Sequence, residues 1–183
     1  MCFTLRLHTS AAPPRVGLTQ ALEGTPINIA TTELDSLAFE FFREFARYEY
    51  CLKATGLREK PGAAKANWTK YAAEVTQVIE TPEKQDLQDA LAYFTNHPPK
   101  KQIVKKCGSL GWSETLPNHQ SKAELILLLV CRVRNNLFHG GKFNGQWFEP
   151  QRSEYLMQHA LVILRACGQA HPKVSEAYAG SAP

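Results

Sequence analysis

A short polar segment, Arg134-Asn135-Asn136-Leu137-Phe138-His139, follows the most apolar stretch of the chain and precedes two glycines. An imidazole titrates close to neutral pH, so His139 is suited to general acid–base catalysis. Asn135 and His139 share one face of a helix, whereas Arg134 lies about 140° from His139 on an ideal helix. Arg134 and His139 therefore converge only by reach or by unwinding at the glycines. The alternative is a plain helix end in which His139 satisfies the last carbonyl groups.

Basic residues concentrate in the middle of the chain. Between Pro98 and Arg152 there are nine Lys or Arg against three Glu, a local net charge of +6, whereas the remainder sums to −2. Such a distribution is expected for a phosphate-rich partner. A solvated loop that is merely rich in lysine is the alternative.

Several kinds of site are excluded by their signatures. The chain has no GxxxxGK[ST] or GxGxxG phosphate loop, no HExxH zinc helix and no GxSxG nucleophile turn. Its five cysteines lack metal-binding spacing, which favours thiols in a reducing cytoplasm. The longest apolar run, Leu125–Cys131, is far shorter than the roughly 20 residues of a membrane span. We expect a cytoplasmic protein without membrane contact, metal or cofactor.

The elements that position these candidates have a helical pattern, because apolar residues recur at steps of three and four between cap residues, glycines and prolines. The expected helices run from Thr32 to a stop at Gly56, from Ala63 to Ile79, from Thr81 to Phe94, from Lys122 to His139 and from Ser153 to Ala170. We predict an all-α fold, a helical bundle of about five helices with at most one small β-hairpin after the fourth helix. An Asn-Gly turn within Phe143–Trp147 predicts that hairpin.

Three regions are expected: a loosely docked arm (1–31), the helical domain (32–175) and a frayed tail (176–183). Within the domain, residues 100–120 are expected to be irregular. The fourth helix begins with Ser121-Lys122-Ala123-Glu124, which matches the capping box. The next turns are apolar on every face, which predicts a central helix or one in a subunit interface.

Arg134 and His139, with four residues between them and Asn135 directly after the arginine, resemble the R-x4-6-H motif of HEPN domains. These all-α domains are found in toxin–antitoxin pairs, abortive-infection proteins, CRISPR RNA-targeting effectors and the RNase L-type kinases. The position is also similar, since the motif closes an apolar late helix that one more helix follows. Residues 45–53 resemble the early helix of small prokaryotic HEPN proteins, so the resemblance spans roughly residues 32–172.

The resemblance implies a homodimer that brings two motifs together in one cleft. It also implies a metal-independent endoribonuclease, of the toxin or antiviral-defence effector type. In that reaction the 2′-hydroxyl attacks the adjacent phosphate and leaves a cyclic phosphate and a 5′-hydroxyl. His139 would be the acid–base residue, Arg134 would hold the phosphate, and Asn135 would orient either of them. The family also allows an antitoxin or nucleotidyltransferase partner.

RNA contacts are expected from polar residues around the motif, namely Lys100, Lys101, Lys105, Lys106, Asn136 and Lys142. Trp112 and Trp147 can stack bases, although packing in the core or a hairpin is the more common role. Glu49 on the first helix can contact the motif arginine, although a solvated face is the more common role of such a carboxylate.

A second function from a different class stays open. It is a catalytically silent HEPN module that binds RNA or nucleotide, or only dimerises. The presence of Arg134, Asn135 and His139 together favours the enzyme. The remaining histidine of interest, His159, is expected to be structural.

Overall fold

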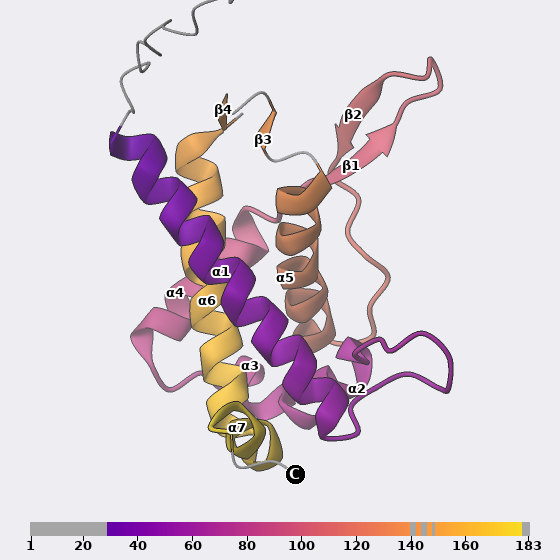
Figure 1. Ribbon diagram of the computed structural model, residues 1–183, viewed down its shortest axis with the longest axis vertical. Helices are drawn as coiled ribbons and strands as arrows, with labels where there is room; N and C mark the ends of the chain where they lie inside the picture. The colour runs from indigo at the N-terminus through magenta and orange to yellow at the C-terminus, as the bar shows by residue number, and fades with distance from the viewer. Residues whose placement is uncertain (1–28, 140–141, 144–145, 148, 181–183) are drawn as a thin grey trace, which may run out of the picture.

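The computed structural model describes residues 29–139, 142–143, 146–147 and 149–180, and helices make up most of them (Figure 1). The helices are α1 (Ile29–Ala54), α2 (Trp68–Glu74), α3 (Thr76–Glu80), α4 (Gln85–Asn96), α5 (Lys122–His139), α6 (Pro150–Ala170) and α7 (Pro172–Tyr178). The strands are β1 (Lys101–Val104), β2 (Leu110–Ser113), β3 (Lys142–Phe143) and β4 (Gln146–Trp147), which pair as two antiparallel hairpins. The predicted all-α class is confirmed.

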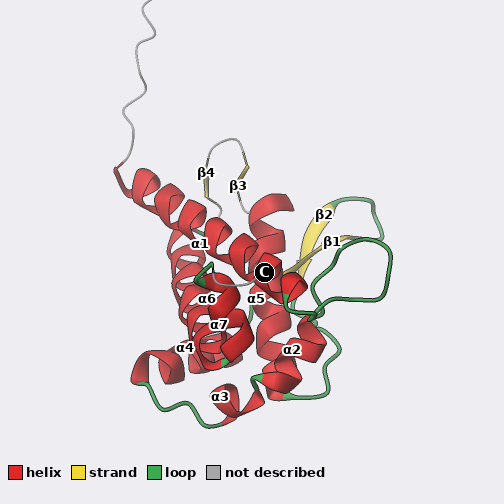
Figure 2. Cartoon of the chain, turned by 60° about the horizontal axis from the view of Figure 1, so that its bottom comes forward, coloured by secondary structure: helices red, strands yellow, loops and turns green. Residues whose placement is uncertain are grey.

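The core lies where the apolar faces of α1, α5 and α6 meet. α1 packs along α6 and passes beside α5 (Figures 1 and 2). Each of the three helices contributes fully buried side chains, such as Phe41, Ile126 and Ile163. Burying one such side chain contributes about 1.5–3 kcal/mol relative to leaving it exposed. Within the described residues, no helix combines the length and apolarity that crossing a bilayer requires.

α5 begins at Lys122 and ends at His139, as predicted. The Ser121 hydroxyl accepts the Glu124 N–H at 3.1 Å, and the Glu124 carboxylate accepts the Gln120 N–H at 2.8 Å. The same carboxylate accepts the Thr69 hydroxyl at 2.8 Å, which joins α5 to α2. These hydrogen bonds lower the pKa of Glu124, and the bond from the Gln120 N–H has the largest effect. The capping box thus sets both the start of α5 and one of its neighbours.

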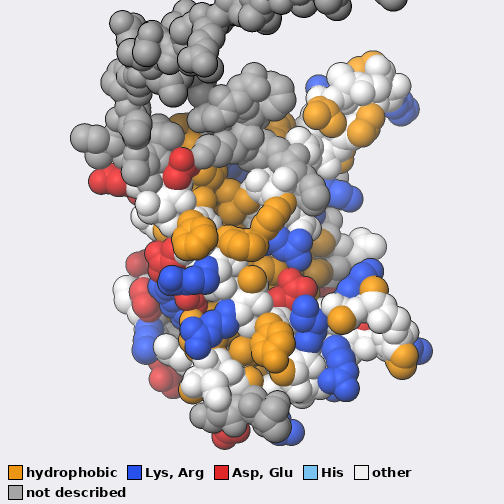
Figure 3. Space-filling model, viewed as in Figure 1, with side chains coloured by type: hydrophobic (Ala, Val, Ile, Leu, Met, Phe, Trp, Pro, Cys, Tyr) orange, Lys and Arg blue, Asp and Glu red, His pale blue; other side chains and the backbone are white. Residues whose placement is uncertain are grey.

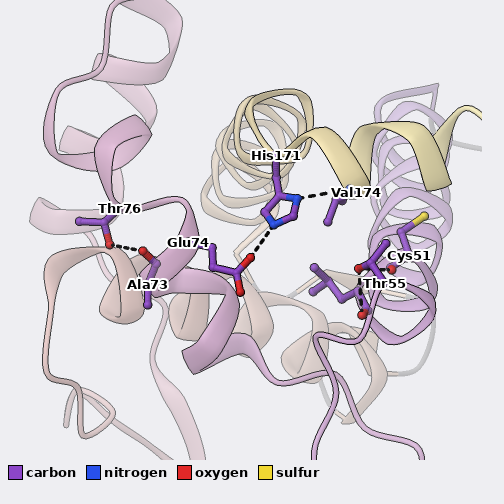
Figure 4. Close-up of polar contacts among 8 residues, drawn as sticks. Cys51, Thr55, Ala73, Glu74, Thr76, His171 and Val174 are labelled. Carbon is purple, nitrogen blue, oxygen red and sulfur yellow. Dashed lines mark hydrogen bonds and ion pairs between the residues drawn. The ribbon is translucent and has the colours of Figure 1, made fainter.

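The predicted second helix is divided in two. Asn67 accepts the Lys70 N–H at 2.8 Å and starts α2, later than the sequence predicted. The helix is interrupted before Thr76, whose hydroxyl donates to the carbonyl of Ala72 at 2.9 Å and to that of Ala73 at 3.2 Å; Figure 4 shows the second of these bonds. Such bonds from a threonine to the preceding turn bend helices. α3 therefore begins as a separate element.

Other predicted helix boundaries also move. α4 starts at Gln85 rather than Thr81, because the Thr81 hydroxyl donates to the Gln77 carbonyl at 2.9 Å and closes α3 instead. α6 starts earlier than predicted, at Pro150. α1 starts at Ile29, inside the predicted arm, and residues 1–28 of that arm lie outside the described residues.

A hairpin occupies the stretch that was predicted to be irregular. β1 and β2 are antiparallel, with Lys101 opposite Ser113 at one end of the hairpin and Val104 opposite Leu110 at the other. Gly108 helps to close the turn with a φ of 83°, a left-handed conformation that glycine adopts readily. This hairpin projects from the bundle beside the C-terminal end of α5 (Figure 1). It adds to the predicted hairpin, which β3 and β4 form, so the described residues contain two hairpins rather than at most one.

α7 follows α6 where the sequence predicted only a helix end. His171 accepts the Val174 N–H at 3.3 Å and donates to the Glu74 carboxylate at 2.7 Å, which caps α7 and ties it to α2 (Figure 4). The Tyr178 hydroxyl donates to the buried Glu44 of α1 at 2.5 Å. The first residues of the predicted tail, up to Tyr178, are therefore helical and docked.

The close contact between α6 and α1 gives a prediction of stability. A Cβ at Gly168 would lie 2.1 Å from Cε1 of Tyr48, a buried ring that stacks on Tyr178. We predict that Gly168→Ala lowers the free energy of unfolding by about 1–3 kcal/mol, measured by urea denaturation, because the ring must move within a packed core. The exposed neighbour provides the control, since Gln169→Ala should change stability by less than about 0.5 kcal/mol. Equal stability of the two variants would contradict the argument.

Candidate functional site

The three motif residues lie at the C-terminal end of α5, and the two whose side chains are described, Arg134 and Asn135, face different surroundings. The Arg134 side chain turns towards α1, where its Nη2 lies 3.4 Å from Glu49 Oε2 and its Cζ lies 4.9 Å from the centre of the Phe45 ring. Asn135 is exposed. His139 is the last residue of α5, and its side chain lies outside the described residues. Arg134 is thus about 7.5 Å along the helix axis from the His139 backbone.

The Glu49 carboxylate lies between two cations. Its Oε1 is 3.6 Å from Lys53 Nζ, and its Oε2 is 3.4 Å from Arg134. Both distances exceed the roughly 2.7–2.9 Å of a well-formed charge-assisted hydrogen bond, and half-exposed pairs of this kind contribute about 0–1 kcal/mol. Contact with the motif arginine, one of the two interpretations of Glu49, is therefore correct. The contact is loose enough for Arg134 to turn to an anion at little cost.

A hollow of about 270 Å³ opens beside Arg134. Its walls come from α1 and α5, with Ala38, Phe41 and Phe42 on one side and Arg134, Leu137 and Phe138 on the other. Trp147 of β4 also lines it, and its indole Nε1 donates to Asp35 of α1 at 3.1 Å. Trp147 is therefore packed, in the more common of the two roles considered for it. Because the walls are mostly apolar, they screen the charge of Arg134 less than water does.

Apolar side chains extend from this hollow onto the surface. Figure 3 shows hydrophobic side chains gathered over α1 and α5 on this face. The rings of Phe42 and Phe138 meet edge to face at 5.2 Å, yet they remain 43% and 55% exposed. Phe39, on the same helix as Phe42, is 64% exposed. Contiguous exposed apolar surface of this kind marks interaction sites.

Other reactive side chains near the site have structural surroundings. Burial raises the pKa of the Cys131 thiol to about 12, although Arg134 acts in the opposite direction, so this cysteine is protonated at neutral pH. Burial lowers the pKa of His159, which Asp89 opposes, and its ring lies 4.6 Å from that of Tyr93. His159 therefore packs against Tyr93, and its structural role stays a prediction. In the part of the chain that the structure describes, no three His, Cys, Asp or Glu side chains gather as metal ligands would.

Four of the five lysines predicted to bind RNA lie on the β1–β2 hairpin or at its base. Lys101, Lys105 and Lys106 are exposed, whereas Lys100 Nζ lies 3.1 Å from the carboxylate of Glu114. The hairpin stands at the same end of the bundle as the motif (Figure 1). Lys142 belongs to β3 and its side chain lies outside the described residues. The structure therefore brings the exposed lysines to the end of the molecule that carries Arg134.

Three side chains hold the base of this hairpin by donating to backbone carbonyls. Asn136 Nδ2 donates to the carbonyl of Lys100 at 2.8 Å. Arg132 and Arg152 donate to carbonyls that flank the hairpin, at 3.0–3.2 Å. Asn136, predicted as an RNA contact, thus has a structural role, and sequence reasoning assigned none to the two arginines. The available signal, an excess of basic residues, does not separate an anchor from an RNA contact.

Comparison with known proteins leaves the arrangement of these side chains as the basis for any functional conclusion. No protein-family model matches the chain, and neither the curated proteins nor the solved structures contain a match.

The anchoring role of Asn136 can be tested on the hairpin itself. We predict that Asn136→Ala accelerates tryptic cleavage after the hairpin lysines by about fivefold, because losing one hydrogen bond of about 1 kcal/mol raises the open population by that factor. Limited proteolysis followed by mass spectrometry measures the rate at each lysine. The adjacent exposed amide is the matched control, and Asn135→Ala should leave the rate unchanged. Equal rates in both variants would contradict the anchor.

Proposed function

We propose that the protein is a metal-independent endoribonuclease of the HEPN type. The observation that carries the proposal is the position of Arg134. Arg134 lines an open, mostly apolar hollow near the end of the helix that finishes with His139, and Glu49 holds its guanidinium only loosely. The exposed lysines of the β1–β2 hairpin stand at the same end. By the family resemblance, the protein acts as a toxin or an antiviral-defence effector.

In the proposed reaction the RNA supplies its own nucleophile. The 2′-hydroxyl oxygen forms a bond to the adjacent phosphorus, and the bond from phosphorus to the 5′-oxygen breaks. His139 handles the proton that leaves the 2′-hydroxyl and the proton that the 5′-oxygen takes up, and Asn135 orients the histidine or the phosphate. Arg134 exchanges Glu49 for the phosphate oxygens and stabilises their developing charge. The products are a 2′,3′-cyclic phosphate and a 5′-hydroxyl.

RNA is held mainly through its phosphates in this proposal. Lys101, Lys105 and Lys106 follow the backbone along the hairpin, with Lys100 and Lys142 nearer the motif. Each phosphate contact releases condensed counterions, so binding weakens as salt rises. Asn136 contributes indirectly, because it fixes the base of the hairpin that carries the lysines.

Two motifs share one cleft in the proposed homodimer. The exposed rings of Phe42 and Phe138 line the hollow beside Arg134, and Phe39 is exposed on the same helix as Phe42, so a second copy that covers these rings brings its own Arg134 close. A two-fold axis makes such a contact self-complementary. The proposed location is the cytoplasm, consistent with cysteines that are free in the described residues. An antitoxin or a nucleotidyltransferase would be a further partner.

One observation favours the second candidate function, the catalytically silent module. The Glu49 carboxylate already neutralises part of the Arg134 charge before any RNA binds. If Arg134 never leaves Glu49, the hollow serves dimerisation or binding of RNA or nucleotide rather than cleavage. Variants of His139 and Arg134 distinguish the ribonuclease from the silent module.

The motif histidine and arginine give the sharpest prediction about catalysis. We expect His139→Ala to lower the rate of RNA cleavage at least 100-fold, the order of magnitude that a general acid–base group supplies, and to leave RNA affinity nearly unchanged. Arg134→Ala should lower both the rate and the affinity, because it removes a charge that would lie on the phosphate. Cleavage of a labelled RNA in EDTA, with the product ends identified by mass spectrometry, measures both effects. A DNA of the same sequence should not be cut.

Matched controls exist for both substitutions. His119 lies in the loop before α5, where its ring bonds the carbonyl of Pro117, and Arg43 is an exposed arginine of α1. His119→Ala and Arg43→Ala should cleave RNA at the wild-type rate. Wild-type activity in His139→Ala, or complete inhibition by EDTA, would contradict the proposed mechanism. RNA binding without any cleavage would favour the silent module.

The dimer prediction concerns the exposed phenylalanines. Phe42→Glu should convert the dimer into a monomer at micromolar concentration, because it places a charge in an apolar contact. Light scattering measures the mass. Tyr155 of α6 has nearly the same exposure, 42% against 43%, so Tyr155→Glu is the matched control and should remain dimeric. A wild-type mass of one subunit would refute the proposed shared cleft.

A further inference from the structure

A second cavity, also of about 270 Å³, lies between the β1–β2 hairpin, α5 and the start of α6. Its lining includes Trp112 of β2, Asn136 and Leu137 of α5, and Arg152 and Ser153 of α6. Leu137 and Trp147 also line the hollow beside Arg134, so the two cavities share a wall. The volume lies just below the range of about 300–1,000 Å³ for small-molecule sites, which suits one flat ring system.

The chemistry of the lining matches a nucleobase. Trp112 is 43% exposed, so its indole offers a stacking surface at the mouth. The Asn136 side chain donates from its Nδ2 to the Lys100 carbonyl, which leaves Oδ1 to accept from the edge of a base, and the Ser153 hydroxyl can donate or accept. Unpaired RNA bases are recognised in this way, by stacking on aromatic rings and hydrogen bonds to their edges.

The surrounding charge points to a ligand that continues out of the cavity. Lys100 and Arg152 belong to its lining and pair with the carboxylates of Glu114 and Glu149 at 3.1 and 3.4 Å. The exposed Lys101, Lys105 and Lys106 lie farther along the hairpin, with Lys101 on the strand face opposite Trp112. A neutral aromatic metabolite would leave this row of cations unused. A single-stranded RNA would place one base in the cavity and its phosphates along the lysines.

We infer that this cavity holds the base of an unpaired RNA nucleotide next to the cleaved phosphate, with Trp112 as its stacking platform, and that it gives cleavage a base preference. The consequence for cleavage rests on the proposed ribonuclease function, whereas the binding does not. Because the two cavities share a wall, this base would belong to the nucleotide next to the cleaved phosphate, which Arg134 would hold.

The test combines a protein variant with a substrate variant. Short single-stranded RNAs are prepared with an abasic site at each nucleotide flanking a cleaved bond, and 2′-O-methyl versions, which cannot be cleaved, report affinity by fluorescence anisotropy. We expect one abasic position to lower affinity and cleavage about 5- to 100-fold, the value of one stacked base. Trp112→Ala should cause the same loss on intact RNA and no further loss on the abasic RNA, because both remove one contact.

Two control variants and a third ligand complete the design. Trp112→Phe should retain most of the affinity, since it keeps an aromatic face. Leu110→Ala should have no effect, because Leu110 lies on the same strand face as Trp112 but outside the cavity. Free AMP and CMP should bind more weakly than the RNAs, and tighter, Trp112-dependent binding of either would overturn the assignment to RNA.

The possible failures are distinguishable. Equal effects of Trp112→Ala on intact and abasic RNA, or no effect on either, would overturn the base cavity even if the wild type cleaves RNA. If RNA is not cleaved, but Trp112→Ala and the abasic site cause non-additive losses of affinity, the ribonuclease function is refuted and the base-binding cavity is supported.

Discussion

The burial of α5 on most of its circumference is the constraint on which the rest of the molecule depends. Its middle turns have no exposed face to spare, because side chains such as Ile126 and Val130 are fully buried. Polar groups are therefore confined to the two ends of the helix, and in its last turns successive residues point about 100° apart. Arg134 faces α1, Asn135 faces solvent and Asn136 faces the β1–β2 hairpin. One apolar helix thus supplies a cationic side chain, an exposed amide and an anchor within three residues.

The fold could be predicted from the sequence where a local signal has a single meaning. The capping box at Ser121 placed the start of α5, and the Asn-Gly turn placed the β3–β4 hairpin. Signals with two meanings misled. His171-Pro172 suits a helix end as well as a helix start, and here it caps α7. The β1–β2 hairpin gave no clear alternation, because both faces are partly exposed and its base is held by side chains from α5 and α6.

The candidate site was predictable in its residue types but not in its partners. The Arg134–Glu49 contact joins residues 85 positions apart, and from the sequence alone a solvated face was the favoured interpretation of Glu49, which the structure corrects. The 140° separation between Arg134 and His139 was visible from helical geometry alone. The structure adds the direction: Arg134 turns to Glu49 and Phe45 of α1 and lines a hollow that α1 helps to build. Contacts between side chains so far apart in the sequence cannot be predicted from the periodicity of apolar residues.

The coincidence of exposed apolar rings with a loose ion pair has a physical consequence for the proposed enzyme. In the single subunit, Arg134 and Glu49 are about a quarter to a third exposed, so water screens their attraction. A second copy seated on Phe42 and Phe138 would exclude part of that water and lower the local dielectric constant. Both the Glu49 contact and any contact with phosphate would then strengthen, but the phosphate, with two faces of oxygens, can also meet the partner's Arg134. Dimerisation would therefore favour the exchange of Glu49 for RNA, which makes assembly part of the chemistry rather than a separate property.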